Sequence, residues 1–182
     1  MRVTYARLLP ILLAGLLWPV GAAHAQASDT EAADAHAIIL RFASIVQTQE
    51  LDFGDIVRSR TLAGTVTISP TGTRTSTGGV TPILNTFSAA RFIGLGTRNR
   101  NVLLNVVPNQ VNITNGTGAT MRVDNFTIGN LSGLTRQGNS NNYRINAANG
   151  QIAFSVGARI SVAANQAAGQ YSGTYQIVFN YQ

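Results

Sequence analysis

Residues 169–182 alternate between apolar and polar side chains more regularly than any other part of the chain. Odd positions from Tyr171 to Tyr181 carry Tyr, Gly, Tyr, Ile, Phe and Tyr, and even positions from Gln170 to Gln182 are polar except Val178. Side chains alternate across a strand with period two, so this pattern predicts a strand with one apolar and one polar face. Chain ends usually fray, so such a regular strand indicates a terminus that is docked.

The preceding residues predict further short strands separated by turns. In the 119–128 segment the apolar parity changes after Asp124, which predicts a β-bulge there. Residues 71–79 and 129–142 are polar and glycine-containing and are predicted to be loops. About nine to eleven strands at regular spacing favour an all-β sandwich or barrel. Besides the last segment, the predicted strands span 37–46, 64–69, 88–95, 101–107, 111–114, 119–128, 143–145, 152–156 and 160–162.

The first 25 residues are typical of a secretory signal peptide. Arg2 and Arg7 precede a short apolar run, and Ala23-His24-Ala25 forms a cleavage site. An uncleaved anchor is the alternative, but the run is short and contains prolines. We therefore expect an exported protein that begins at Gln26, located in the periplasm, at the cell surface or outside a Gram-negative cell. Residues 26–36 predict a flexible acidic leader, and residues 37–182 a single domain.

Composition excludes several kinds of chemistry. The chain has no cysteine, so disulfides and cysteine–zinc sites are excluded. Without residues 1–25 it holds eleven arginines, no lysine and seven acids, a net charge of +4. The arginines are scattered singly, which favours solvent-facing strand positions over a nucleic-acid patch. We expect no nucleic-acid partner and no transmembrane segment after signal cleavage.

Few residues offer catalytic or metal-binding chemistry. His36 is the one histidine after residue 25, so neither a triad nor a histidine-rich metal site has a second member. Asp52 and Asp55 are candidates for cation binding, although a turn stabilised by an aspartate side chain is the simpler interpretation. The 71–79 segment lacks the lysine of a phosphate-binding loop. We therefore predict no catalytic residues, no metal and no cofactor.

Several motifs together resemble one bacterial family of exported domains, domain of unknown function 4402, which is similar to chaperone–usher fimbrial (pilin) subunits and to spore-coat-U-like subunits. In pilus subunits a glycine fourteen residues from the end precedes alternating apolar residues and a penultimate tyrosine, positions that Gly169 and Tyr181 match here. The resemblance implies an immunoglobulin-like, pilin-like β-sandwich without an established activity. The motifs span residues 51–54, 64–72, 78–80, 89–92, 121–126, 154–157 and 169–173.

By the same resemblance, the final strand is the place where a partner pairs. Its predicted partner-binding residues are Gly169, Tyr171, Tyr175, Ile177, Phe179 and Tyr181. The tyrosines are also candidates for a sugar-stacking platform, although they share their face with Ile177 and Phe179, which favours packing or strand pairing. Pilus subunits donate an amino-terminal strand, and here a donor strand would be built on Ile38, Leu40 and Phe42. The same segment, residues 37–46, is alternatively the domain's own first strand.

Three functions follow as hypotheses. The leading one is a structural, fimbrial-subunit-like component that assembles by β-strand addition with like subunits and with a periplasmic chaperone and usher. The second is a self-contained extracytoplasmic module that binds carbohydrate or a surface protein. The third, a hydrolase, has no catalytic constellation to support it.

Overall fold

The computed structural model describes residues 37–182, and every regular element in this range is a β-strand. The prediction of an all-β chain is therefore confirmed for this part of the protein. The predicted signal peptide, its cleavage site and the acidic leader lie outside the described residues. Residues 38–182 form one compact unit.

The strands form a large sheet, a smaller sheet and a two-stranded ribbon, and every pairing is antiparallel. The seven-stranded sheet holds β1 (Ser44–Gln49), β3 (Gly64–Ile68), β4 (Arg74–Gly78), β6 (Ala90–Leu95), β8 (Val111–Thr114), β9 (Thr120–Ser132) and β12 (Gln151–Val162). The four-stranded sheet has the order β10 (Leu134–Arg136), β11 (Asn142–Ile145), β7 (Asn101–Val107) and β13 (Gln176–Tyr181). The ribbon pairs β2 (Ile56–Arg58) with β5 (Val80–Pro82).

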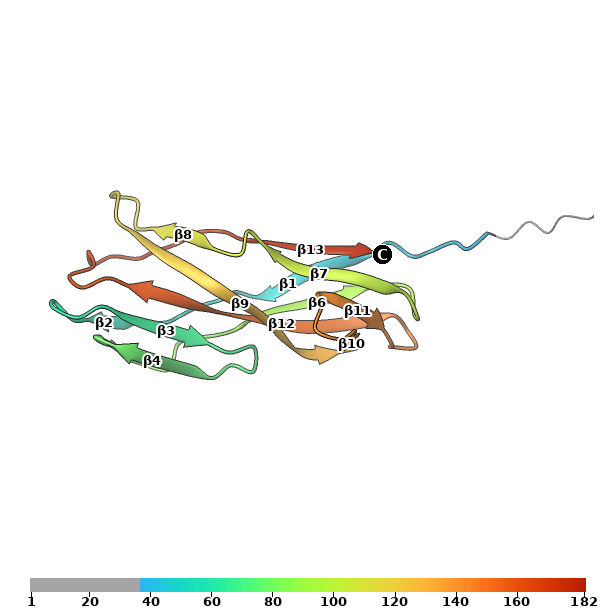
Figure 1. Cartoon of the computed structure of the whole chain (residues 1–182), viewed down its shortest axis with the longest axis horizontal. Coiled ribbons are helices and arrows are strands. Elements are labelled where there is room, and N and C mark those ends of the chain that lie inside the picture. The colour runs from blue at the N-terminus through green and yellow to red at the C-terminus, as the bar shows by residue number, and fades with distance from the viewer. Residues whose placement is uncertain (1–36) are drawn as a thin grey trace, which may run out of the picture. The chain divides into compact units, whose positions relative to one another are not determined.

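Strand β12 organises the large sheet. Its first half, residues 151–156, pairs with β6, and its second half, residues 158–162, pairs with β3 (Figure 1). Strand β9 pairs with β12 over both halves, with a register shift between Gly157 and Arg159. Gly157 lies where the partner changes, and a Cβ there would meet the carbonyl oxygen of Ile68 at 2.2 Å. Glycine is therefore required at the crossing point.

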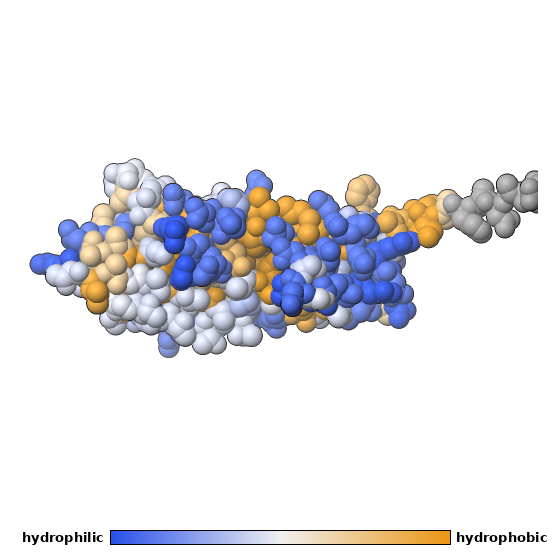
Figure 2. Space-filling model, viewed as in Figure 1, coloured by the Kyte–Doolittle hydropathy of each residue, from blue (hydrophilic) through white to orange (hydrophobic). Residues whose placement is uncertain are grey.

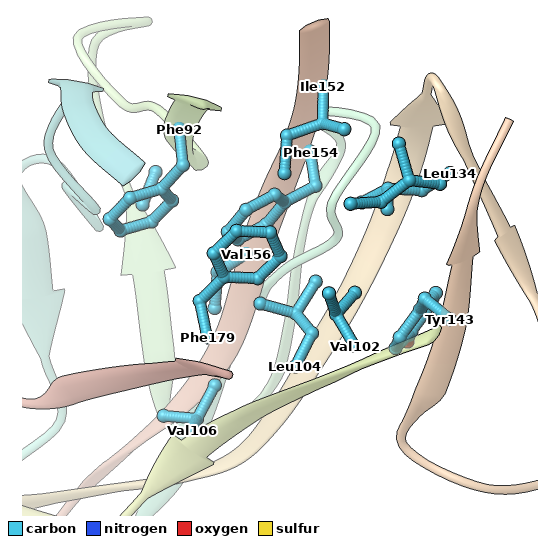
Figure 3. Packing of buried hydrophobic residues seen from close by; sticks show 12 residues of the cluster. Phe92, Val102, Leu104, Val106, Leu134, Tyr143, Ile152, Phe154, Val156 and Phe179 are labelled. Carbon is cyan, nitrogen blue, oxygen red and sulfur yellow. The ribbon is translucent and has the colours of Figure 1, made fainter. Parts of the chain in front are cut away.

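The main core lies between the two sheets. The rings of Phe92 and Phe154 stack with centroids 5.1 Å apart, and both come from the large sheet. Figure 3 shows side chains from both sheets pointing toward one another in this layer. The buried residues of the main core are Ala90, Phe92, Val102, Leu104, Val106, Leu134, Tyr143, Ile145, Ile152, Phe154, Val156 and Phe179.

A second core lies against the other half of β12. The smaller sheet contributes none of its buried residues, which come from the large sheet and from Val80 of the ribbon. The second core consists of Val66, Val80, Val123, Ala158, Ile160 and Val162. One side of this core therefore has no opposing sheet, which leaves room for the groove described below.

The sequence prediction of nine to eleven strands is too low, because residues 37–182 alone contain thirteen. The three-residue strands β2, β5 and β10 are too short to show a period in the sequence. Residues 74–78, predicted as a loop, form β4, and β9 continues to Ser132 through residues also predicted as a loop. Conversely, the two predicted strands around Gly157 are one strand, β12.

Two further predictions are confirmed, the bounds of two strands and the position of the bulge. Strands β7 and β8 have the predicted bounds. The bulge after Asp124 is present, because the pairing of β9 with β12 shifts register there and Asn125 has a φ of 51°. In residues 37–182 no helix is long and apolar enough to cross a membrane.

Candidate functional site

The final strand has the predicted two faces. Phe179 is buried, Ile177 and Tyr181 are partly buried against the main core, and Gln176 and Asn180 are exposed. The regular strand β13 is shorter than the predicted 169–182 segment, but Ser172 forms an isolated bridge with Thr114 of β8. The whole segment from Ser172 to Tyr181 therefore runs along β8 and then β7.

Strand β13 is the last strand of the smaller sheet, so one of its edges has no strand partner within residues 37–182. Strand β1 is likewise the last strand on its side of the large sheet and pairs only with β6. An unpaired edge presents a row of backbone N–H and C=O groups that another strand can bind.

A groove opens over the second core. We define it by its two flanks, residues 50–58 and residues 166–175, and its volume is about 1080 Å³. The flank 50–58 includes β2, which pairs only with β5, and the flank 166–175 leads into β13. Apolar side chains of β8, β9 and β12, which we call the groove floor, lie between the flanks: Val111, Ile113, Met121, Val123, Ile160 and Val162.

The structure places the predicted partner-binding residues in two groups. Gly169, Tyr171 and Tyr175 line the groove, whereas Ile177, Phe179 and Tyr181 lie in or against the main core, which Tyr175 also contacts. The groove floor could not be predicted from the sequence, because its residues have the same strand periodicity as ordinary core positions.

Tyr175 has an unusual environment on the flank of the groove. Its ring packs on Phe126 with centroids 5.0 Å apart, and burial raises the pKa of its hydroxyl to about 12. The hydroxyl is buried and has no hydrogen-bond partner within residues 37–182. Tyr175 therefore joins the groove flank to the main core, against which its ring also packs.

The predicted donor residues lie in a segment that precedes β1. Residues 37–42, which we call the tail, belong to no strand, whereas residues 44–46 are part of β1. The interpretation of the whole 37–46 segment as the first strand is therefore wrong for residues 37–43. Phe42 is 95% exposed, Ile38 72% and Leu40 38%, and Figure 2 shows the tail as hydrophobic surface.

Asp52 stabilises a turn at the start of the 50–58 flank. Asp52 Oδ1 accepts a hydrogen bond from the N–H of Gly54 at 2.8 Å, which is the turn interaction expected from the sequence. Residues 37–182 contain no group of three histidine or acidic side chains placed to hold a metal ion. Glu50, Asp52 and Asp55 instead line the groove.

A second charged cluster lies on β9 and β12, away from the groove lining. Arg159 Nε and Nη2 donate to Asp124 Oδ1 and Oδ2 at 2.9 and 3.2 Å, and Arg122 Nη2 lies 2.7 Å from Asp124 Oδ2. The hydrogen bond from Arg159, aided by the charges of both arginines, holds the pKa of Asp124 below its ordinary value of 3.8. The cluster ties the bulged part of β9 to β12.

We expect Asp124→Asn to weaken the acid dependence of stability. A carboxyl whose folded pKa is lowered contributes stability above its unfolded pKa, and this contribution is lost as pH falls through the folded pKa. The free energy of unfolding, measured by denaturant titration between about pH 2 and pH 5, should therefore fall less steeply in Asp124→Asn than in the parent. Asp55→Asn is the control, because Asp55 forms no ion pair within residues 37–182. Parallel pH profiles of the parent and Asp124→Asn would contradict the assigned role.

Comparison with known proteins identifies the family. The family model described as Domain of unknown function (DUF4402) matches residues 43–181, and the chain belongs to this family. The match begins at Ala43, immediately after the tail. No curated protein and no solved structure matches the chain.

Proposed function

We propose that this member of the DUF4402 family is an exported structural subunit that assembles by β-strand addition. The observation that carries the proposal is the groove, in which an apolar floor lies beside β2, a strand with one unpaired edge. In strand addition, backbone hydrogen bonds provide affinity and alternate side chains enter apolar pockets and set the register. The groove offers both kinds of contact.

The energetics of an incoming strand favour this interpretation. Its apolar side chains would remove the groove floor from water, a gain of about 25 cal/mol for each Å² of apolar surface. Its backbone would pair with the free edge of β2, the strand in the 50–58 flank. A chain with an open groove therefore gains stability by binding a strand.

We further propose a like subunit as the strand donor, with Ile38, Leu40 and Phe42 of its tail entering the groove, and a periplasmic chaperone and usher as partners before assembly. In this proposal the two layers are an immunoglobulin-like, pilin-like sandwich, and the protein acts in the periplasm or at the cell surface without enzymatic activity. The exposed apolar side chains of the tail support the choice of donor. Large exposed apolar side chains on one segment are typical of an interaction site.

A substitution on the groove floor tests the proposal. Ile113 is partly buried in the floor, whereas Asn112 is exposed on the opposite face of β8. We expect Ile113→Asn to shift self-association to about 5- to 150-fold higher concentration, because an unpaired amide in an apolar contact costs about 1–3 kcal/mol. Sedimentation velocity over a range of concentrations measures the shift, and Asn112→Ala is the matched control.

Circular dichroism and a thermal melt establish that Ile113→Asn is folded, and Met121→Gln serves as a second floor variant. If the parent stays monomeric at every concentration and in the presence of chaperone, strand addition is wrong. That result would leave the alternative, a self-contained module for carbohydrate or a surface protein. Tyr171 and Tyr175 beside the groove favour this alternative as sugar-stacking side chains.

A further inference from the structure

The penultimate residue, Tyr181, connects three separate parts of the fold. Its hydroxyl accepts a hydrogen bond from the N–H of Thr97 at 2.7 Å and donates one to the carbonyl oxygen of Arg41 at 2.8 Å. Thr97 lies in the loop between β6 and β7, and Arg41 lies in the tail. The ring of Tyr181 thus packs against the main core, while its hydroxyl group binds the backbone of the tail.

Arg41 is also held by two other groups. Its N–H donates to Thr97 Oγ1 at 2.8 Å, and its Nη1 donates to the carbonyl oxygen of Asn149 at 3.3 Å. Both backbone groups of Arg41, its N–H and its carbonyl oxygen, therefore form hydrogen bonds. By contrast, Ile39 and Phe42 on either side of it are almost fully exposed.

Glycine makes the room for this arrangement. A Cβ at Gly96 would lie 2.5 Å from Ile145 Cδ1 and 3.3 Å from the hydroxyl oxygen of Tyr181. The N–H of Gly96 donates to the carbonyl oxygen of Gly150 at 2.9 Å, and Gly150 has a φ of 75°. The space around the Tyr181 hydroxyl is therefore shaped by two loops, one that follows β6 and one that precedes β12.

We propose that Tyr181 is a positioning residue that fixes the base of the tail and keeps the tail out of the groove of its own subunit. Thr97 Oγ1 accepts the N–H of Arg41, and the Tyr181 hydroxyl donates to its carbonyl oxygen. We call this pair of side chains the clamp. The clamp is inferred from its hydrogen bonds, which do not depend on the proposed function. Only its consequence, that the tail is presented to another copy, rests on the proposed function.

The reach of the tail supports this assignment. Tyr181 lies six positions beyond Tyr175, the nearest groove-lining residue of the final segment, or about 20 Å along a strand. With Arg41 held, residues 37–40 reach about 14 Å, too short to place Ile38 or Leu40 in the subunit's own groove. Release of Arg41 moves the fixed point to Ala43 and lengthens the reach of Ile38 from about 10 Å to about 17 Å. Residues 26–36 carry no large aliphatic or aromatic side chain with which to fill an apolar groove.

The test is an intramolecular distance measurement on the chain from residue 26. The chain lacks cysteine, so spin labels can be attached at Ile39→Cys in the tail and Asn112→Cys on β8. Both positions are exposed. Dilution with unlabelled protein restricts the electron–electron double resonance signal to distances within one subunit.

We expect one narrow distance distribution in the parent. In Tyr181→Phe, and independently in Thr97→Val, the distribution should become roughly twice as wide and gain shorter distances, because an untethered terminus samples many conformations. The matched control is Tyr171→Phe, which also removes a hydroxyl with two hydrogen bonds, to Ala167 and Gln166, but does not contact the tail. Its distribution should equal that of the parent.

The clamp is overturned if Tyr181→Phe and Thr97→Val leave the distribution unchanged, or if the parent is already as broad as the variants. A thermal melt of each variant verifies that the body is folded, and the two variants break different bonds, so unfolding of one does not prevent the test. Sedimentation velocity keeps the two proposals apart. A narrow parental distribution in a protein that never self-associates would support the clamp and refute the proposed function.

Discussion

Replacement of Phe179 by alanine is expected to lower the free energy of unfolding by about 3–5 kcal/mol. Phe179 is buried in the main core and pairs with Leu104 across β13 and β7. Removing its ring leaves a cavity between the two sheets. The surrounding side chains are closely packed and can move only partly into this cavity. The loss is a large part of the 5–15 kcal/mol that stabilises a typical domain, so the yield of folded protein should also fall.

Denaturant unfolding followed by circular dichroism measures this loss, and Asn180→Ala provides the control. Asn180 is the next residue on the same strand, is exposed and points to the opposite face. Its replacement should change stability by less than about 0.5 kcal/mol. Equal effects of the two substitutions would mean that β13 does not close the core in the way described.

Deletion of the tail is expected to abolish self-association while the body stays folded. A chain that begins at Ala43 retains all of β1, whereas deletion through residue 46 would also remove half of that strand. The tail is largely exposed, and Arg41 is its one residue with a hydrogen bond to the body among those described. Circular dichroism should therefore remain that of a β-protein, and sedimentation velocity should show a monomer.

Mixing gives a sharper version of this experiment. Under the proposed function, the truncated chain still has a groove but has no strand to donate, so it should end each assembly that it enters. Adding it to full-length protein should shorten the assemblies in proportion to its share. A truncated chain that unfolds, or that associates as well as the parent, would contradict the tail as donor.

The sequence predicted the elements with strong alternation and missed those without it. Residues 101–107 and 111–114 were placed correctly because their apolar side chains recur with a strand period and Pro108 and Gly116 mark their ends. Strand β4 has the sequence Arg-Thr-Ser-Thr-Gly and no large apolar side chain, since it lies at the edge of the large sheet. Its backbone pairing with β3, not a hydrophobic face, makes it a strand.

The site was only partly predictable, for a related reason. Alternation in the final segment indicates a docked strand, but it does not tell which residues face a closed core and which face an open groove. That difference depends on the smaller sheet ending at β13 and leaving the second core uncovered. Likewise, Tyr181 could be predicted as an apolar-face residue, but its hydrogen bond to Arg41 joins positions 140 residues apart.

The position of β12 in the chain has a consequence for the order of folding. Both halves of the large sheet need β12 as their central partner, and β12 begins only at Gln151. A chain that emerges amino-terminus first therefore presents β3, β6 and β9 long before the strand that joins them, and β13 follows later still. Such pairing between distant residues forms slowly, and its unpaired strands are prone to aggregation. The large sheet therefore cannot form completely until most of residues 37–182 have emerged.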